Sequence, residues 1–308
     1  MVKMRRNGLF VLIVKQSSKT KNILVTGANG QLGGELRRLA PSTPWRFVFT
    51  DVTEIKGRET VYLDITNPRA VDIICESEDI DVIINAAGYT NVDKAEDDPT
   101  TADLLNHLAP QYLAETARRR GALLVHVSTD YVYGGDSSVP YPEDYPPAPA
   151  GVYGATKLQG DQAVTGSACR HYIFRTSWLY SPYGRNFVKT MRQLTQDRDS
   201  LAVVFDQVGT PTYAADLAGT ILKAVGSDAP SGIYHYSDEG VCSWYDFACA
   251  IRDLSGNDCE IRPCHSDEFP SKVRRPHYSV LDKTKVKKTF GIAIPHWYES
   301  LKKCIDRL

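Results

Sequence analysis

Short apolar runs alternate with longer amphipathic stretches along the chain from residue 22. The runs NILVTG, RFVFTD, DVIINAAG, ALLVHVSTD and HYIFRTSW have the length and the β-branched and aromatic content of buried strands. Between them, QLGGELRRLA, PRAVDIICESE, LNHLAPQYLAETARRRG and YGATKLQGDQAV have the apolar spacing of helices. Five strands interleaved with helices predict an α/β fold of the Rossmann type, with a doubly wound parallel sheet.

This alternation loosens after Trp178, where frequent prolines divide the chain into shorter pieces. Because proline interrupts both helices and central strands, this part favours a smaller, less regular lobe over further sheet repeats. We therefore expect a sheet domain over residues 22–177, and mainly a second lobe over residues 178–308, with segments that return to the first domain. Residues 1–21 precede the regular pattern and are expected to form a disordered extension.

The charges of the chain nearly cancel, with 36 lysine and arginine residues against 37 aspartate and glutamate residues. Since no overall field attracts nucleic acid or anionic lipid, we expect neither as a partner. The apolar run at residues 9–14 is too short to span a bilayer, and no small-residue cleavage site follows it. We therefore expect neither a membrane anchor nor secretion.

Seven cysteines are scattered along the chain, without a C-x-x-C pair and without the spacing of zinc ligands. An odd and scattered set is typical of free thiols in a reducing compartment. The expected location is the cytoplasm.

A glycine-rich turn, VTGANGQLGG, joins the first predicted strand to the first helix. Gly27, Gly30 and Gly33 lack a Cβ, so backbone N–H groups and the helix N-terminus can approach a pyrophosphate closely. Three glycines alone are equally compatible with a plain strand–helix turn. Their place after the first strand, with Asp51 at the end of the second, favours a dinucleotide-binding domain over residues 22–177.

Asp51 bears on the choice of cofactor. A carboxylate at this position accepts hydrogen bonds from a ribose 2′-hydroxyl and repels a 2′-phosphate, which favours NADH over NADPH. Lys56 and Arg58 follow closely and could neutralise such a phosphate, so the use of both cofactors stays open. The alternative is that Asp51 only caps the turn.

Two further segments lie where the rest of a dinucleotide would bind. Asp64, in VYLDIT, is placed to meet the adenine, and the small residues of NAAGYT follow a strand end beside which a nicotinamide ribose could lie. Small residues there also suit close packing alone. The full set of expected cofactor contacts is Gly27, Asn29, Gly30, Gln31, Leu32, Gly33, Asp51, Asp64, Ile65, Ala86, Ala87, Gly88, Tyr153 and Lys157.

Tyr153 and Lys157 are four positions apart in GVYGATKLQGD, so a helix places both on one face. A phenol with its ordinary pKa near ~10 is a slow acid at neutral pH, and a nearby ammonium group plus an oxidised nicotinamide ring would lower that pKa. The spacing by itself also occurs in solvated surface pairs. The glycine turn upstream, and the strand end Ser128, Thr129 and Asp130, favour a catalytic pair.

These motifs together resemble the extended short-chain dehydrogenases/reductases. Seven blocks are similar, in the same order, to those of the dTDP-4-dehydrorhamnose reductase family: VTGANGQLG, INAAGYTNVDKAE, LAETARRRGALLVHVSTDYVYGG, YGATKLQGD, FRTSWLYSPYGRNFVKTM, DQVGTPTYAADLA and RRPHYSVLD. The similarity runs from about residue 22 to the end of the chain. It implies hydride transfer from NAD(P)H to the C4 ketone of a dTDP-sugar, dTDP-4-dehydro-L-rhamnose, by a cytoplasmic monomer or homodimer with a C-terminal substrate lobe.

The resemblance implies roles for three catalytic residues. Tyr153 passes the proton, Lys157 holds the nicotinamide ribose and lowers the pKa of Tyr153, and Thr129 hydrogen-bonds the reacting oxygen. These roles follow from matching positions in the family's Thr-Tyr-Lys set.

It also implies substrate contacts. Thr129 and Asp130 match a sugar-contacting pair, and Trp178 matches an aromatic residue that faces the sugar. An indole offers a flat apolar face to a deoxysugar methyl group, although a core tryptophan is the alternative. Arg275, or its neighbour Arg274, would meet the diphosphate because a guanidinium group fits phosphate oxygens.

The chain departs from the family pattern at a few positions. Tyr133 stands where phenylalanine is usual, and Asp161 where glutamate is common. Some relatives bind Mg²⁺ through carboxylates at a subunit contact. Glu35 matches one such position, but TPTYAADLA offers only Ala215 or Asp216 and no glutamate, so we assign no metal-binding residue.

Two other functions stay open on the sequence alone. A nucleotide-sugar epimerase or dehydratase on the same fold would keep its cofactor through the cycle, and Asp130 formally fills the acidic position of a dehydratase. A non-catalytic module similar to the regulatory subunit of methionine adenosyltransferase would bind dinucleotide and a partner protein. The joint presence of Thr129, Tyr153, Lys157 and Trp178 argues against that module.

Overall fold

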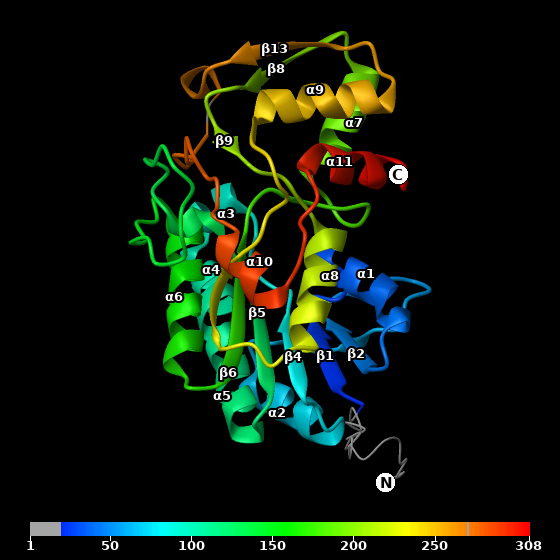
Figure 1. The fold of residues 1–308 in the computed structure, drawn as a ribbon, viewed down its shortest axis with the longest axis vertical. Coiled ribbons are helices and arrows are strands. Elements are labelled where there is room, and N and C mark those ends of the chain that lie inside the picture. Colours follow the sequence, from blue (N-terminus) through cyan, green and yellow to red (C-terminus); the bar gives the residue numbers. More distant parts are fainter. Residues whose placement is uncertain (1–19, 270) are drawn as a thin grey trace, which may run out of the picture.

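One parallel sheet of seven strands organises most of the described chain, residues 20–269 and 271–308, in this computed structural model (Figure 1). The strand order is β11-β6-β5-β4-β1-β2-β3. Most of the predicted extension at residues 1–21 lies outside the described residues. The bounds of the strands are β1 Asn22–Thr26, β2 Arg46–Asp51, β3 Val61–Tyr62, β4 Val82–Asn85, β5 Leu123–Thr129, β6 Arg170–Thr176 and β11 Gly232–His235.

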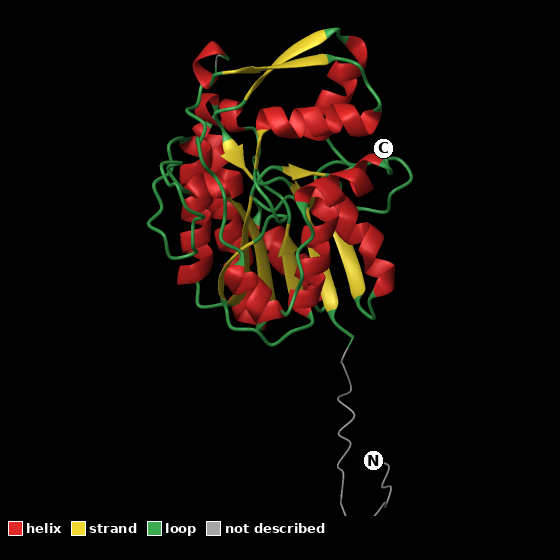
Figure 2. Ribbon diagram, turned by 45° about the horizontal axis from the view of Figure 1, so that its top comes forward, coloured by secondary structure: helices red, strands yellow, loops and turns green. Residues whose placement is uncertain are grey.

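Helices cover both faces of this sheet (Figure 2). The successive residues of β1 point alternately to the two sides, so Ile23 and Val25 join one apolar core and Leu24 joins the other. The first core packs α1 Gln31–Leu39, α8 Ala214–Val225 and α10 Thr284–Phe290 on the sheet, and the second packs α2 Pro68–Ser77, α5 Ala109–Arg120 and α6 Val152–Gly166. The predicted doubly wound α/β fold is confirmed.

A smaller lobe lies above the carboxyl ends of the strands (Figure 1). Its core joins α7 Phe187–Asp197, α9 Trp244–Ser255 and α11 Trp297–Ile305, with the parallel pair β8 Ser200–Val204 and β13 Glu260–Cys264. Between the lobe and the sheet, β7 Leu179–Tyr180 pairs with β10 Thr212–Tyr213, and β9 Val208–Gly209 pairs with β12 Cys242–Ser243. The remaining helical segments are α3 Val92–Asp97, α4 Pro99–Asp103, the π-helical turn Leu104–Leu108, and the 3-10 turns Ala40–Ser42, Asp130–Val132 and Ser266–Glu268.

The sheet has a point where its connection reverses direction. β1 pairs with β2 on one side and with β4 on the other, so the chain leaves β1 toward one edge and later returns to the opposite side. The carboxyl ends of β1 and β4 therefore flank a crevice in which ligands of doubly wound sheets bind. The glycine turn follows β1, and Ala86 and Ala87 follow β4.

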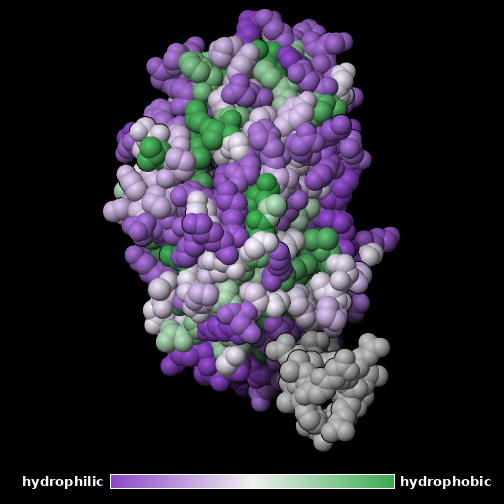
Figure 3. All heavy atoms as spheres, in the orientation of Figure 1, coloured by the Kyte–Doolittle hydropathy of each residue, from purple (hydrophilic) through white to green (hydrophobic). Residues whose placement is uncertain are grey.

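The surface carries no extended apolar face on the side shown in Figure 3, where hydrophilic residues surround small separate groups of hydrophobic ones. Among the helices of residues 20–269 and 271–308, none combines the length and the apolar content that a bilayer crossing requires.

Candidate active site

The glycine turn is shaped by close backbone contacts. Gly27 has a φ of +63°, and a Cβ on it would lie 2.7 Å from the backbone nitrogen of Ala87. A Cβ on Gly33 would lie 2.4 Å from the carbonyl oxygen of Gly27. Gly30 begins α1 without a side-chain cap, so no side chain competes for the N–H groups of the first turn. The turn thus has the open helix N-terminus that a pyrophosphate requires.

Asp51 ends β2 and anchors this turn. Its Oδ2 accepts the backbone N–H of Asn29 at 3.0 Å, and its Oδ1 accepts the N–H and the hydroxyl of Thr53 at 2.9 and 2.8 Å. The carboxylate therefore caps the turn in the way that the alternative reading expected. Its role toward a ribose stays a prediction.

Arg37 is linked through Thr60 to Asn29 of the glycine turn. Arg37 donates from Nη2 to the hydroxyl of Thr60 at 3.2 Å, and that hydroxyl donates to Oδ1 of Asn29 at 3.3 Å. Burial, and then the positive charge of Arg58, lower the pKa of Arg37. The expected adenosine end of the site therefore carries the Arg37 guanidinium group as well as the Asp51 carboxylate.

The other expected cofactor residues occupy the neighbouring strand ends. Asp64 accepts the N–H and the hydroxyl of Thr66 at 2.9 and 2.7 Å, and Ile65 is buried in the core beneath it. Ala86 and Ala87 lie against Gly27, which brings the end of β4 to the glycine turn. Their contacts with a cofactor stay predictions.

Close packing also fixes α6, the helix that carries Tyr153 and Lys157. A Cβ on Gly154 would lie 2.2 Å from the carbonyl oxygen of Tyr131, and a Cβ on Gly160 would lie 2.1 Å from that of Asn106. Asn106 is in the π-helical turn, so this turn and α6 approach at backbone distance. The glycines of YGATKLQGD therefore seat the helix against the carboxyl end of β5.

Tyr153 faces the strand end as expected. It is half-buried, its ring packs edge-on against Tyr131 at 5.5 Å, and a hydrogen bond joins it to the side chain of Thr129. Burial raises the pKa of Tyr153, and the bond to Thr129 only partly opposes this. The predicted lowering of the Tyr153 pKa is therefore wrong for the protein by itself, because burial outweighs the hydrogen bond to Thr129.

Lys157 is one turn further along α6 and is 5% exposed. Its Nζ donates to the carbonyl oxygen of Val127 at 2.6 Å. Burial lowers the pKa of Lys157 to about 8, and the Asp161 carboxylate opposes this shift. At neutral pH the ammonium form therefore still dominates.

Asp130 lies beside Thr129 and is 3% exposed. The Thr129 hydroxyl donates to its Oδ1 at 3.0 Å, while its Oδ2 has no hydrogen-bond partner among the described residues. Burial raises the pKa of Asp130 to about 7, against hydrogen bonds from Thr129 and from Ser279. Ser279, which comes from the C-terminal lobe, is a site residue that the sequence did not point to.

Trp178 follows the carboxyl end of β6 in an unusual backbone conformation, with a φ of +49°. Its indole stacks on Trp244, with ring centroids 3.6 Å apart and an interplanar angle of 11°. Gly209 lies directly below, since a Cβ there would be 2.8 Å from the indole. A left-handed φ costs of order 1 kcal/mol for a bulky residue, so surrounding contacts hold this tryptophan in place.

Arg275 and Arg274 diverge in the structure. Arg275 donates from Nη2 to Asp93 at 3.0 Å and hydrogen-bonds the phenol of Tyr131, next to Asp130. Arg274 instead pairs with Asp136 at 3.3 Å and is more exposed. Of the two arginines, Arg275 therefore lies nearer to the strand-end residues.

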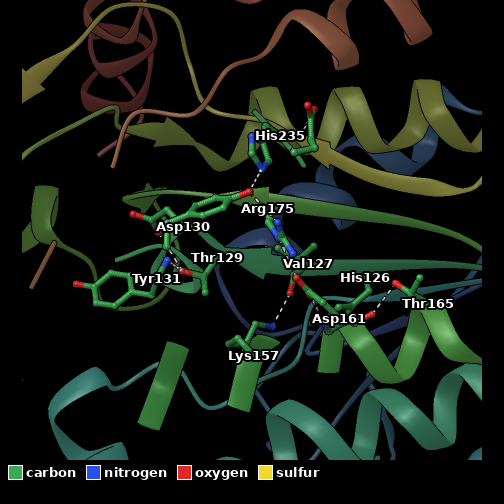
Figure 4. A network of polar contacts seen from close by, with 12 residues as sticks. His126, Val127, Thr129, Asp130, Tyr131, Lys157, Asp161, Thr165, Arg175 and His235 are labelled. Atoms are coloured by element: carbon green, nitrogen blue, oxygen red, sulfur yellow. Dashed lines mark hydrogen bonds and ion pairs between the residues drawn. The ribbon is translucent and has the colours of Figure 1, made fainter. Parts of the chain in front are cut away.

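A chain of buried polar groups runs from α6 to the strands β6 and β11 (Figure 4). Arg175 donates from Nε to Oδ2 of Asp161 at 2.9 Å and from Nη1 to the hydroxyl of Tyr133 at 2.8 Å. The same hydroxyl lies 2.9 Å from Nε2 of His235. Tyr133 and Asp161, the two departures from the family pattern, thus contact the same arginine.

Two features mark the class of extended short-chain dehydrogenases/reductases. The first is a glycine turn at the point where the connection of a doubly wound sheet reverses direction. The second is a tyrosine and a lysine on one helix that faces a strand-end hydroxyl. Within that class the chain belongs to the RmlD substrate binding domain family, whose model matches residues 21–308.

Relatives agree with this assignment over nearly their whole length. The chain is 40% identical to the dTDP-4-dehydrorhamnose reductase of Aggregatibacter actinomycetemcomitans, over 91% of this chain and 97% of that protein. Among solved structures, a dTDP-4-dehydrorhamnose reductase from Clostridium acetobutylicum aligns with a TM-score of 0.87 at 42% identity, over 93% of this chain and 99% of the other. The NADP complex of the Bacillus anthracis enzyme aligns with a TM-score of 0.88 at 36% identity, over 94% and 100% of the two chains.

Proposed function

We propose that the chain reduces the C4 ketone of dTDP-4-dehydro-L-rhamnose, giving dTDP-L-rhamnose. The observation that carries this proposal is the meeting of Tyr153, Lys157 and Thr129 at the carboxyl edge of the sheet, next to the glycine turn. Full-length relatives that bear the name of this reductase support the choice of substrate.

In this mechanism the three side chains handle the oxygen and its proton. A reduced nicotinamide, when bound, would supply the hydride, and negative charge would then grow on O4 of the sugar. Thr129 stabilises that oxygen by a hydrogen bond, and Tyr153 donates a proton to it. Lys157 binds the ribose and adds the positive charge that favours the phenolate left behind.

The glycine turn fits a dinucleotide, because no side chain caps the N-terminus of α1 and its first N–H groups can meet a pyrophosphate. We propose that both NADPH and NADH are used. Asp51 favours a free 2′-hydroxyl, whereas Arg37 and Arg58 can neutralise a 2′-phosphate. The NADP bound to the Bacillus anthracis relative supports the second of these.

Asp130, Trp178 and Arg275 are proposed to hold the substrate. Asp130 and Thr129 would hydrogen-bond sugar hydroxyls, and the indole of Trp178, stacked on Trp244, would pack against the deoxysugar. Arg275 would bind the diphosphate after leaving or sharing Asp93.

The position that matches a magnesium ligand in some relatives does not fit a divalent ion here. Glu35 is fully buried, and its two carboxylate oxygens accept Arg307 Nη1 and Arg38 Nε, each at 2.7 Å. Asp216 accepts the hydroxyl of Ser300 at 2.6 Å. No group of three acidic, histidine or cysteine side chains in residues 20–269 and 271–308 is arranged to hold a metal ion. We therefore propose activity without Mg²⁺.

All seven cysteines are free, which supports a reducing compartment and hence the cytoplasm. A monomer or a homodimer remains the expected state.

The decisive experiment mixes the protein with dTDP-4-dehydro-L-rhamnose and either reduced cofactor, and follows the absorbance of the reduced nicotinamide. A reductase oxidises one cofactor for each sugar reduced. An epimerase or dehydratase would convert the sugar without net oxidation, and a non-catalytic module would leave it unchanged, so either result would overturn the proposal.

A further inference from the structure

Three residues of α6 follow one another on the face that packs on the sheet, one helical turn apart. Tyr153 and Lys157 are the proposed catalytic pair, and Asp161 comes next, with 1% of its surface exposed. We propose that Asp161 is a positioning residue for Lys157: its carboxylate, held by Arg175, keeps the ammonium group charged and in place for the cofactor ribose. This inference rests on the proposed function, because it takes Lys157 as a cofactor ligand.

Arg175 holds the carboxylate of Asp161 in place by a hydrogen bond. Arg175 is 3% exposed and uses Nε on Asp161, while its Nη1 donates to the hydroxyl of Tyr133. His235 completes the chain, since its Nδ1 lies 2.9 Å from the carbonyl oxygen of Tyr141 and its Nε2 lies 2.9 Å from the Tyr133 hydroxyl. The carbonyl can only accept, so Nδ1 carries the proton and Nε2 accepts the phenol. The Tyr133 hydroxyl also lies 3.3 Å from the carbonyl oxygen of Pro142, a longer contact than the one to His235.

The histidines of the network carry no charge at neutral pH. Burial lowers the pKa of His235 to about 3, and burial followed by the charge of Lys157 holds the pKa of His126 well below its usual range. Lys157 and Arg175 are then two buried cations with Asp161 as the anion between them (Figure 4).

Other charged groups around α6 are engaged with different partners. Glu96 of α3 accepts the N–H of Val152 at 2.7 Å, and Asp103 pairs with His107 of the π-helical turn at 2.9 Å. From the strand end, Asp130 is bonded to Thr129. Among the charged groups around Lys157, Asp161 is thus the anion that stabilises its ammonium form.

The ammonium group of Lys157 donates its hydrogen bond to the Val127 carbonyl at 2.6 Å and not to Asp161. Asp161 therefore acts on Lys157 through its charge. Oδ1 of Asp161 has no hydrogen-bond partner among the described residues, and Nε2 of His126 is 3.9 Å from it. The carboxylate therefore keeps one oxygen uncommitted beside the Lys157 turn, where burial would otherwise favour the neutral amine.

The test is the dissociation constant of NADPH, measured by fluorescence from pH 6 to pH 10 in the wild-type protein and in Asp161→Asn. In the wild type, binding should weaken as the pH passes about 8, where Lys157 loses its proton. Without the carboxylate the midpoint should fall by about one pH unit, which makes binding roughly fivefold weaker at pH 8, nearly tenfold weaker at pH 9 and above, and leaves it within about threefold at pH 6. Asp161→Glu should restore the midpoint.

Two further variants keep the test decisive. Tyr133→Phe is the matched control, because it removes a hydroxyl from Arg175 without changing any charge, and its midpoint should equal that of the wild type. Arg175→Gln removes the cation that holds the Asp161 carboxylate ionised and in place, so its midpoint should fall, in the same direction as that of Asp161→Asn. This variant decides the question if Asp161→Asn does not fold.

A purely structural role for Asp161 would lower the stability of these variants and leave the midpoint of their NADPH binding unchanged, which would overturn the inference. Because NADPH binding is measured without the sugar, the test of Asp161 does not depend on whether the proposed substrate is correct. A wild type that does not reduce dTDP-4-dehydro-L-rhamnose, but shows the expected shifts, refutes only the substrate. Normal turnover with unshifted midpoints refutes only the role of Asp161.

Discussion

The two ends of the candidate cleft are built in different ways. At the glycine turn the backbone itself forms the site, with added Cβ atoms at Gly27 and Gly33 excluded by contacts of 2.7 and 2.4 Å. At the α6 end the site consists of buried side-chain charges, with Lys157 and Asp161 each no more than 5% exposed. The cofactor end therefore tolerates no added side-chain volume at these glycines. The chemical end tolerates no loss of either charged side chain, because its partner would stay buried without a counter-charge.

The largest effect on turnover is expected when Tyr153, the proposed proton donor of the chemical end, loses its hydroxyl. Tyr153→Phe keeps the ring that packs against Tyr131 but has no proton to donate. We expect turnover to fall by roughly 10²–10⁴-fold, with the affinity for NADPH changed less than about threefold. Steady-state kinetics and a binding titration check the two parts, and turnover close to that of the wild type would refute the proton-donor role.

At the cofactor end, the corresponding change adds one methyl group. Gly33→Ala should weaken NADPH binding by about tenfold or more, because its Cβ would meet the carbonyl oxygen of Gly27 and the turn must shift. Gly219→Ala in α8 is the matched control, since nothing lies within 4 Å of an added Cβ there. That variant should bind NADPH normally and be as stable as the wild type or slightly more so. Equal binding by both variants would show that the turn does not hold the cofactor.

Asp130 links the chemical end to the pH dependence of stability. Its pKa rises from the ordinary 3.8 to about 7 on folding, so the folded protein binds more protons than the unfolded chain between these values. The free energy of unfolding should therefore fall as the pH rises from about 4 to 7, by roughly 2–4 kcal/mol from this residue. Asp130→Asn should remove that part of the slope. Urea denaturation at several pH values measures it, and an identical slope in the variant would contradict the assignment.

The smallest effect is expected at Glu35, which lies in α1 just after the glycine turn. Because Arg38 and Arg307 already neutralise this buried carboxylate, EDTA treatment should change turnover by less than about twofold, and added Mg²⁺ should not restore or raise it. A loss of activity with EDTA that Mg²⁺ reverses would show that a metal is required after all.

The features best predicted from the sequence are those that depend on residues close together in the chain. The glycine turn follows from local steric rules, and Tyr153 and Lys157 share a face because four residues nearly complete a helical turn. The helix expected over 105–121 is instead part of a helical run that begins with α4 and has the π-helical turn Leu104–Leu108 in its middle, before α5. Pro110 has no N–H to donate to the carbonyl of Asn106, which explains this irregular turn.

Contacts between distant segments could not be predicted in the same way. Trp244 and Ser279 reach the strand end from the C-terminal lobe, and Arg175 meets Asp161 only because β6 lies beside β5 under α6. No spacing along the chain marks these residues. The direction of the Tyr153 pKa shift also depends on how deeply the ring is buried, which one sequence does not show.

The most direct measurement is a crystal structure with NADPH and dTDP-L-rhamnose bound. The account predicts that the phenol of Tyr153 and the hydroxyl of Thr129 both lie about 2.6–3.2 Å from O4 of the sugar, with Lys157 on the ribose. A sugar whose O4 is out of reach of both groups, with Tyr153 turned toward solvent, would contradict it.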